Sequence, residues 1–342
     1  MKFKYLVITL FLIAQSCSVS SKIGVRHVGA QTHKVQDKVQ EKIQAYLLSK
    51  HVNGSIAVVK KNKVIFNEGI GLANRATGRV NLSSTTFPIG SVTKVIVAAC
   101  ILQLQEKGKL STEDSISTFI PNFPNGRRIK LIHLLNHTSG IEENLFFHGK
   151  SKDMLKGISV KFPAGKKWDY NDINYFVLGL VVEKASGESL HNYIQKNIFD
   201  KASMQHSGFM TQNRPVPYNS KGYIMTGDYA LPVNILNLSK LFGCGDIYST
   251  ALDLCLFDEA LLSGKLLSKR SLQEMLTPGS PSKYGEGVYI YGNKVFSRGV
   301  VGGWETLQVF FKDQTIMAIL LNVRDKNINI HQLSSDIKNI IH

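Results

Sequence analysis

The N-terminal part of the chain combines helical and strand-like spacing of apolar residues. Residues 35–47 are apolar at helical intervals and predict an amphipathic helix that ends near Ser49. Two strand-like runs follow at 55–60 and 64–67, and the three polar residues between them predict a hairpin. A third short strand is predicted at 69–72, before a loop at 76–86.

The C-terminal part returns to strand-like alternation. Residues 287–291 and 294–297 alternate on either side of Gly292 and Asn293, two residue types that favour tight hairpin turns. The segments that follow predict further strands at 307–311 and 315–323, and a helix at about 330–341.

Strands at both ends of the chain, with helices between them, predict an α+β fold. We expect an antiparallel sheet built from both chain ends and flanked by helices, with a mostly helical lobe inserted. The sheet lobe would comprise about 34–90 and 284–342, and the helical lobe about 91–283.

Two central segments are apolar on nearly every side and predict buried helices. The first begins at Ser91 and stops near Gly108; the second covers 175–185 and ends at Gly187. Asn171 or Asp172 is a plausible N-terminal cap for the second helix. Elsewhere in this region we expect helices and loops at 111–200, irregular chain at 201–240 and a helix at 249–262.

The first residues are typical of an export signal. Lys2 and Lys4 precede an apolar run at 5–14 that is too short to span a bilayer as a mature helix. The residues before Cys17 are similar to a bacterial lipoprotein cleavage site, which would make Cys17 the lipidated first residue; plain secretion with cleavage nearby is the alternative. We therefore predict a signal peptide at 1–17, a tether at 18–33 and one domain at 34–342.

Composition and charge narrow the classes of partner. The chain is 43% hydrophobic and 19% charged, as in ordinary globular proteins. Its formal charge is +16, and removal of residues 1–16 leaves +14 because Lys2 and Lys4 are the only charges there. The lysines are scattered, apart from short runs such as 60–63, and there is no basic helix, zinc-ligand spacing or aromatic–basic RNA motif. We expect anionic polymers of the cell envelope, and not nucleic acid, as the polyanionic partner.

Three cysteines remain after Cys17, and an odd number in an exported protein argues against a disulfide framework. Cys100 lies in the first apolar helix and is expected to be an inert core residue. A bridge between Cys244 and Cys255 is left open.

The strongest candidate for chemistry is the start of the first apolar helix. Ser91 and Lys94 are three residues apart and would share a face of that helix. A serine needs a base to become a nucleophile, and a desolvated lysine can supply one. Two other Ser-x-x-Lys sequences occur in the chain. Ser280 with Lys283 lies in a Pro/Gly/Ser-rich loop, and Ser335 with Lys338 lies in a polar terminal helix. Only Ser91 opens a buried helix.

Three motifs occur in the order seen in one protein family. They are Phe87-Pro88-Ile89-Gly90-Ser91-Val92-Thr93-Lys94, Leu134-Leu135-Asn136-His137-Thr138-Ser139-Gly140 and Tyr170-Asn171-Asp172. With them the chain resembles the serine β-lactamase and D-alanyl-D-alanine carboxypeptidase group, in its class C-like and esterase-related branch. The likeness covers roughly residues 40–325 and implies a β-lactamase/transpeptidase-like fold.

The resemblance implies roles for individual residues. Ser91 would be the acylated nucleophile, and Lys94 would help to take its proton. Tyr170 would activate Ser91 or protonate the leaving group, so that either Lys94 or Tyr170 is the base. The backbone amides of Ser91 and Gly303 would form the oxyanion hole. His137 belongs to a segment that looks structural in this family, and it is left out of the mechanism.

Two departures from the family pattern affect these expectations. Asp172 stands where an amide is usual, and a carboxylate near Lys94 would favour the charged amine. The final motif, usually Lys or His, a small residue and Gly, aligns with Val300-Val301-Gly302, so that Val300 replaces the cation or imidazole. Arg298 is a possible substitute whose direction the sequence does not give. This departure weakens the case for binding a substrate carboxylate more than the case for acyl transfer.

Other matches are weaker. Tyr291-Gly292-Asn293 fits the family's Tyr-x-Asn spacing but lies in a predicted hairpin turn. Trp304 and Phe310 are expected in the core or at the rim.

The sequence thus predicts an exported serine hydrolase that forms an acyl-enzyme on Ser91 and cleaves an ester or amide, such as a D-alanyl peptide, a β-lactam or a small ester. The resemblance implies no metal or cofactor, and we expect a monomer held at the envelope by a lipid anchor on Cys17. The alternative is a weak or inactive family member that binds peptidoglycan fragments or a partner protein.

Overall fold

The computed structural model describes residues 28–142, 157–211, 219–233, 237–280 and 282–342. The predicted lipid-attachment residue Cys17 lies outside the described residues. The chain divides into two compact units, Met1–Lys38 and Val39–His342. The first helix, α1 (Val28–Ser49), has residues in both units and begins inside the segment predicted as a tether. The remaining elements belong to the second unit.

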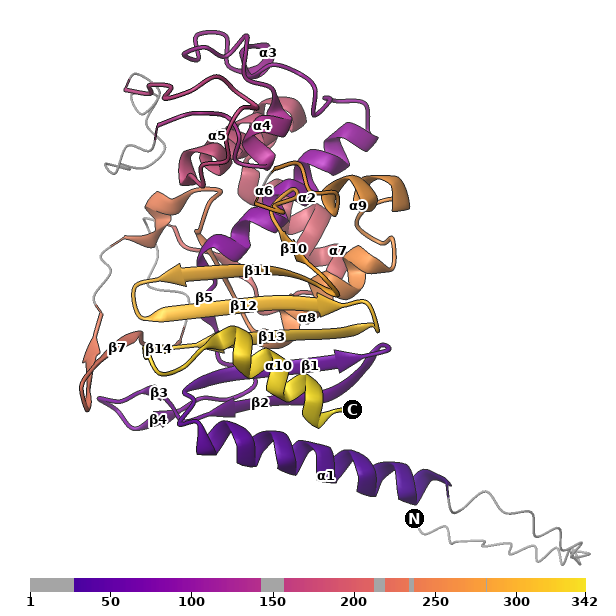
Figure 1. Cartoon of the computed structure of the whole chain (residues 1–342), viewed down its shortest axis with the longest axis vertical. Helices are drawn as coiled ribbons and strands as arrows, with labels where there is room; N and C mark the ends of the chain where they lie inside the picture. The colour runs from indigo at the N-terminus through magenta and orange to yellow at the C-terminus, as the bar shows by residue number, and fades with distance from the viewer. Residues whose placement is uncertain (1–27, 143–156, 212–218, 234–236, 281) are drawn as a thin grey trace, which may run out of the picture. The chain divides into compact units, whose positions relative to one another are not determined.

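The second unit is built on a six-stranded antiparallel sheet with the order β10-β11-β12-β13-β1-β2 (Figure 1). The two chain ends meet where β1 pairs with β13, from Gly54 opposite Leu321 to Lys60 opposite Thr315. This pairing confirms the predicted sheet made from both ends. The strands are β1 (Gly54–Lys60), β2 (Lys63–Ile70), β10 (Tyr289–Tyr291), β11 (Lys294–Val301), β12 (Trp304–Phe311) and β13 (Thr315–Leu321).

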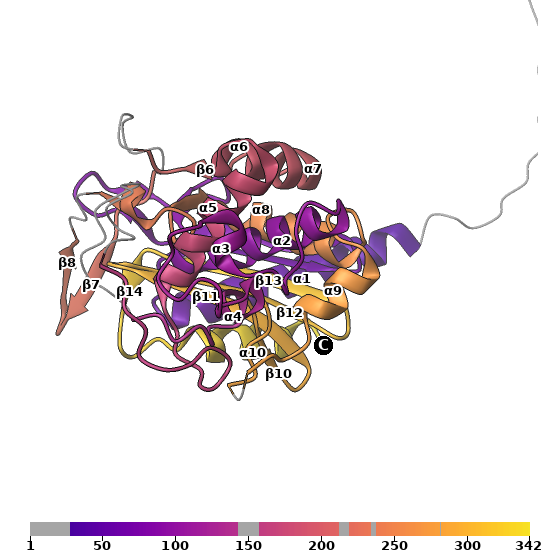
Figure 2. The ribbon, with the colours of Figure 1, turned by 90° about the horizontal axis from the view of Figure 1, so that it is seen from above.

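Alternating residues of the central strands supply two separate hydrophobic cores. Ala57 and Val59 of β1 join the core on the helical side of the sheet. Ile56 and Val58 join the core on the other side, where Leu333 of α10 (Ile330–Ile340) packs. Helices therefore lie on both faces of the sheet, as the view from above shows (Figure 2). The fold is the predicted mixed α/β arrangement with an antiparallel sheet flanked by helices.

The helical lobe is organised around two helices that are almost wholly buried. The first, α2 (Thr93–Glu106), follows a single turn of 3-10 helix, η1 (Gly90–Val92), so Ser91 lies in that turn and not in the α-helix itself. The second, α5 (Asp172–Ser186), begins three residues earlier than predicted. The side chain of Asn171 caps it by accepting a hydrogen bond from the Ile173 amide, and Gly187 ends it in a left-handed conformation.

The other helical segments of this lobe are all shorter than α2 and α5. They are α3 (Ile116–Phe119), α4 (Leu131–Leu135), α6 (Leu190–Ile194), η3 (Gln195–Phe199), α7 (Asp200–Ala202), η4 (Leu238–Leu241), α8 (Ala251–Leu262) and α9 (Lys269–Met275).

Short strands occur where the sequence predicted irregular chain or loops. Within 201–240 these are β6 (Gly208–Phe209), β7 (Tyr223–Thr226) and β8 (Tyr229–Pro232), and β7 pairs with β14 (Val323–Arg324) in parallel. Such short segments have too few residues to show a period. The remaining short strands are β3 (Leu72–Asn74), β4 (Arg79–Val80), β5 (Phe87–Pro88) and β9 (Ile247–Ser249).

Cys100, Cys244 and Cys255 are buried free cysteines, so the bridge left open by the sequence is not formed. Within the described part of the chain, none of the helices is both long and apolar enough to cross a bilayer.

Candidate active site

Ser91 and Lys94 meet as their spacing predicted. Ser91 lies in the η1 turn and is partly exposed, whereas Lys94, in the first turn of α2, is fully buried. The Lys94 Nζ donates a hydrogen bond of 2.9 Å to the Ser91 Oγ. A buried cation therefore contacts the side chain of a serine that solvent can reach.

The ammonium group of Lys94 contacts three oxygens. Besides Ser91, it donates to the backbone oxygen of Cys244 at 2.9 Å, and it forms an ion pair of 2.7 Å with the Asp172 Oδ1. Burial alone would lower the pKa of Lys94, but Tyr170 and Asp172 outweigh burial and hold that pKa above its usual value. Lys94 is therefore a charged donor in the resting site.

Asp172 is brought to Lys94 by the start of α5. As the first residue of that helix it lies at the positive end of the helix dipole, which favours a carboxylate. Its side chain remains 32% exposed, against 1% for that of Lys94. The predicted contact of the unusual carboxylate with Lys94 is thus present, and one side of Asp172 still faces solvent.

Tyr170 also lies beside Lys94. The Lys94 Nζ is 5.1 Å from the centre of the Tyr170 ring, which is partly exposed. The structure therefore brings Ser91, Lys94, Tyr170 and Asp172 together from two segments far apart in the sequence.

His137 supports the segment that carries Tyr170. Its ring lies 4.3 Å from the Tyr170 ring, and its Nδ1 accepts hydrogen bonds from the Asn171 amide and the Asn174 side chain. The proton of the neutral ring is then on Nε2, which has no hydrogen-bond partner in the described residues. Burial, helped by Lys94, pushes the pKa of His137 well below its ordinary value. His137 is thus a buried, neutral side chain that packs on the Tyr170 ring and is bonded to the residues after Tyr170.

The register of β11 corrects the predicted oxyanion hole. A Cβ built on Gly299 would lie 1.9 Å from the Ile89 oxygen and 2.9 Å from the Ser91 nitrogen, so the backbones touch there. Gly302 and Gly303 instead form the turn beyond Val301, the last residue of β11. Gly303 packs against β7, with its own notional Cβ 2.2 Å from the Tyr223 nitrogen. The expectation that placed Gly303 beside Ser91, and Gly302 as the motif glycine, was wrong by three residues.

In this register, Ser297 and not Val300 stands at the motif position where the family usually carries Lys or His. Ser297 and Gly299 are buried on the face toward Ser91, whereas Arg298 and Val300 alternate with them and are exposed on the other face. Ser297 is only 4% exposed, and its Oγ donates to the Gly287 oxygen at 2.9 Å. The motif thus reads Ser297-Arg298-Gly299, with serine in the place of Lys or His.

Arg298 does not replace the cation. Its guanidinium forms an ion pair of 2.6 Å with Glu305 on the face away from Ser91.

The weaker sequence matches also lie apart from this site. Tyr291 donates to the Ser282 oxygen from β10, and the Oγ of Ser335 donates to the His331 oxygen while Lys338 pairs with Asp313. Trp304 and Phe310 are core residues.

The sequence did not reveal the acceptor that Cys244 supplies. This residue belongs to a tight loop in which Asp246 accepts a hydrogen bond from the Gly243 amide and lies 2.7 Å from the His191 Nε2. Gly243 has a φ of 70°, which favours glycine. The pair of glycines around Cys244 indicated a turn, but a backbone oxygen that binds a lysine has no signal of its own in the sequence.

Comparison with known proteins gives the family. A family model described as Beta-lactamase matches residues 39–327. The chain belongs to the beta-lactamase family. Within this family it is similar to PbpX of Bacillus subtilis (strain 168), whose name places it with the penicillin-binding proteins, at 39% identity over 308 residues. That match covers 88% of this chain and 78% of PbpX.

A second relative carries a named substrate. The teichoic acid D-alanine hydrolase of Staphylococcus aureus (strain MRSA252) is 30% identical over 325 residues, covering 90% of this beta-lactamase-family chain and 80% of that protein. Among solved structures, FmtA from Staphylococcus aureus superposes with a TM-score of 0.80 at 26% identity, covering 90% of this chain and 89% of FmtA. These matches span the sheet and the helical lobe together.

Proposed function

We propose that this protein is a serine hydrolase that cleaves D-alanyl esters through an acyl-enzyme on Ser91. The observation that carries the proposal is the contact of Ser91 with the charged Lys94, which Asp172 and the Cys244 oxygen hold in place. A nucleophile beside a fixed cation is suited to acyl transfer, because charge that develops in the transition state meets a preorganised partner.

In the proposed first step, Tyr170 takes part as the phenolate: the Ser91 Oγ attacks the ester carbonyl, and its proton passes to the Tyr170 oxygen, which becomes a neutral phenol. Before that transfer, the ammonium of Lys94, 5.1 Å from the ring centre of Tyr170, is the counter-charge of the phenolate. Tyr170 then gives the proton to the departing alcohol, which leaves the acyl group on Ser91. Water attacks the acyl-enzyme by the reverse sequence of proton transfers and releases the amino acid.

We assign the oxyanion hole to the amides of Ser91 and Val300. A Cβ on Gly90 would lie 3.2 Å from the Val300 nitrogen, and Gly299 abuts the Ser91 nitrogen. These two amides therefore lie at one point of contact between η1 and β11. Backbone donors fixed in this way stabilise the tetrahedral intermediate without any rearrangement during the reaction.

The charges around Ser91 favour an aminoacyl substrate. The motif position that would meet a substrate carboxylate with a cation holds Ser297. Asp172, 32% exposed, instead offers a carboxylate to a substrate ammonium group. An ester of D-alanine has a free amine and no free carboxylate on its acyl part, whereas a penicillin or a D-alanyl-D-alanine peptide has the carboxylate.

The relatives and the net charge indicate which alcohol carries the D-alanyl ester in the proposed substrate. A relative at 30% identity is named a teichoic acid D-alanine hydrolase. A chain with a formal charge of +16 attracts polyanions over long distances. We therefore propose an anionic envelope polymer that carries D-alanyl esters as the substrate. We further propose that the protein is an exported monomer, anchored at the envelope through Cys17.

The test is release of D-alanine from D-alanylated teichoic acid and from D-alanine methyl ester, with L-alanine methyl ester as the stereochemical control. We expect turnover of both D-alanyl esters by the wild type and none by Ser91→Ala. Acylation by benzylpenicillin should be slower than acylation by the ester. Binding of the polymer without any release of D-alanine would instead favour an inactive family member that acts as a binding protein.

A further inference from the structure

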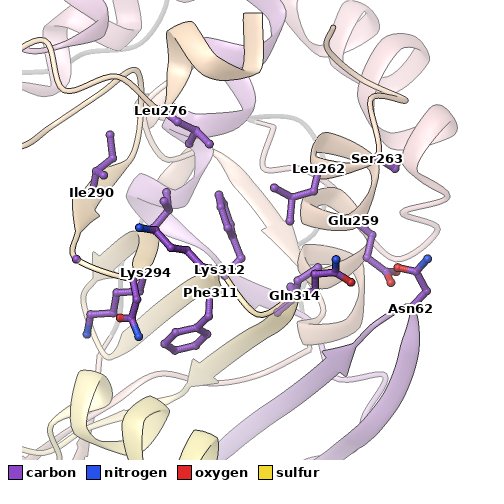
Figure 3. Close-up of a pocket in the computed structure, with 15 residues that line it drawn as sticks. Asn62, Glu259, Leu262, Ser263, Leu276, Ile290, Lys294, Phe311, Lys312 and Gln314 are labelled. Carbon is purple, nitrogen blue, oxygen red and sulfur yellow. The ribbon is translucent and has the colours of Figure 1, made fainter. Parts of the chain in front are cut away.

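We propose that a second cavity, at the far end of β11 from Ser91, binds the alkyl chain of an anionic amphiphile. The cavity has a volume of about 600 Å³ and lies between the last turn of α8, the β10–β11 hairpin and the β12–β13 turn (Figure 3). Lys294 at its edge begins β11, and Gly299, which touches Ser91, lies five residues along that strand. At ~3.3 Å per residue the two sites are separated along the strand by roughly 17 Å.

The interior of the cavity is apolar. Its apolar lining joins partly exposed side chains to the buried core residues Phe310 and Ile316; the partly exposed ones are Leu262, Leu276, Ile290 and Val295. Leu262, the last residue of α8, is 37% exposed although it borders this concave surface. A cavity of this size with apolar walls is typical of sites for small apolar ligands, and burial of an alkyl chain there would remove this surface from water.

The mouth of the cavity is cationic on one side. Lys312 is exposed in the β12–β13 turn and has no carboxylate partner among the described residues. Lys294, at the same edge, holds its Nζ 5.7 Å from the ring centre of Phe296, which packs on the face of the sheet away from the apolar lining. An ammonium group without an ion pair among the described residues, placed beside an apolar cavity, is complementary to an anionic head group with an apolar tail.

The one carboxylate of the lining lies apart from these cations. Figure 3 shows Glu259 with Asn62 on one side of the cavity, and Lys294, Lys312 and Ile290 on the other. Burial raises the pKa of Glu259, which makes its charged form less favourable than in water. The separation gives the ligand a direction, with its head group at Lys312 and its chain running toward Leu262.

A displacement assay with 11-(dansylamino)undecanoic acid tests the proposal on the whole protein. We expect dodecyl phosphate and dodecanoate to displace the probe. Among alkyl phosphates or carboxylates of different chain length, affinity should rise about fourfold for each added methylene, the equivalent of about 0.8 kcal/mol. Dodecyltrimethylammonium should displace it at least about tenfold less well, because the lysines repel its head group. Vesicles of phosphatidylglycerol form a second arm: displacement by vesicles as well as by dispersed amphiphile assigns the source to a membrane lipid, and displacement by dispersed amphiphile alone assigns it to a free one.

Two substitutions and their matched controls locate the site. Leu262→Trp should fill the cavity and weaken binding at least about tenfold, and Lys312→Glu should do the same through its charge. Leu82→Trp, at a leucine 56% exposed in another part of the unit, and Lys184→Glu, at an exposed lysine of α5, should leave binding within about twofold of the wild type. Ester hydrolysis should be unchanged in all four variants, which also shows that each one is folded. Absence of displacement, equal displacement by the cationic amphiphile, or full binding by Leu262→Trp would overturn the proposal.

Discussion

Lys94 and Asp172 form an ion pair of 2.7 Å in which the lysine is buried and the carboxylate reaches the surface. The pair holds Lys94 in its charged form, with a pKa above the usual value because Tyr170 and Asp172 outweigh its burial. A lysine that stays protonated cannot take the proton of Ser91. We therefore propose Tyr170 as the proton acceptor, with Lys94 as the fixed charge beside it.

The substitution Asp172→Asn tests whether Lys94 acts as a fixed positive charge or, in its neutral form, as the base. The change removes a negative charge from Lys94, so the pKa of Lys94 should fall. If the charged lysine is required, activity at neutral pH drops roughly 10- to 100-fold, and the alkaline limb of the pH profile moves to lower pH. The measurement is kcat/KM for a D-alanyl ester between about pH 6 and 11. If neutral Lys94 were the base, the same substitution would raise activity near neutral pH.

The register of β11 predicts where a carboxylate-binding group can be restored. Ser297→His places an imidazole on the face toward Ser91, at the position where the family carries Lys or His. We expect acylation by benzylpenicillin to accelerate at least about tenfold, which one charged hydrogen bond can provide. Val300→His is the matched control, because that side chain points to the opposite face and is 37% exposed. Acceleration by the Val300 variant and not by the Ser297 variant would support the register expected from sequence.

A phosphonate adduct on Ser91 tests the proposed oxyanion hole. The phosphoryl oxygen should lie about 2.7–3.1 Å from the backbone nitrogens of Ser91 and Val300 in a crystal structure of the adduct. The turn at Gly302 and Gly303 should remain packed on β7. Contact of that oxygen with the Gly303 nitrogen would show our assignment to be incorrect.

From the buried carboxyl group of Glu286 we predict that the free energy of unfolding depends on pH. It is buried, neither carboxyl oxygen has a hydrogen-bond partner in the described residues, and burial together with Glu274 raises its pKa from 4.5 to about 8. The folded state therefore keeps the proton that the unfolded state loses. The stability that this group contributes is full below about pH 4.5 and falls as pH rises toward 8, by about 3 kcal/mol at pH 7.

Glu286→Gln should remove that loss. Urea unfolding at pH 5 and at pH 8 should show the variant gaining stability over the wild type at the higher pH. An exposed glutamate, Glu113, provides the control substitution Glu113→Gln, which should leave the pH dependence unchanged. Equal pH dependence in the wild type and Glu286→Gln would mean that the carboxyl group finds a partner or solvent in the folded protein.

The spacing of apolar residues predicted much of the fold, because each helix or long strand has its own period within one short segment of the sequence. The hairpin at Gly292 and Asn293 is confirmed, and so is the sheet assembled from both chain ends. The buried character of α2 separated Ser91 from the serines with the same spacing to lysine. The short strands β6 to β8 were missed, since two to four residues do not define a period.

The register of β11 could not be obtained from the sequence, since two glycine positions compete for the same motif. Gly302 follows two small apolar residues and fits the spacing as well as Gly299 does. Only the pairing of β11 with β12 and its contact with η1 decide between them. The acceptor at Cys244 was also out of reach, because it is a main-chain oxygen 150 residues from Lys94.

The central claim is that Ser91 carries the acyl group, and intact-mass spectrometry of acid-quenched protein tests it most directly. Brief incubation with an activated D-alanyl ester should add one D-alanyl group, and peptide mapping should place it on Ser91. Ser335→Ala, which removes a serine with the same spacing to lysine, should acylate like the wild type, and Ser91→Ala should not. An adduct that persists in Ser91→Ala, or one that maps to another residue, would contradict the account.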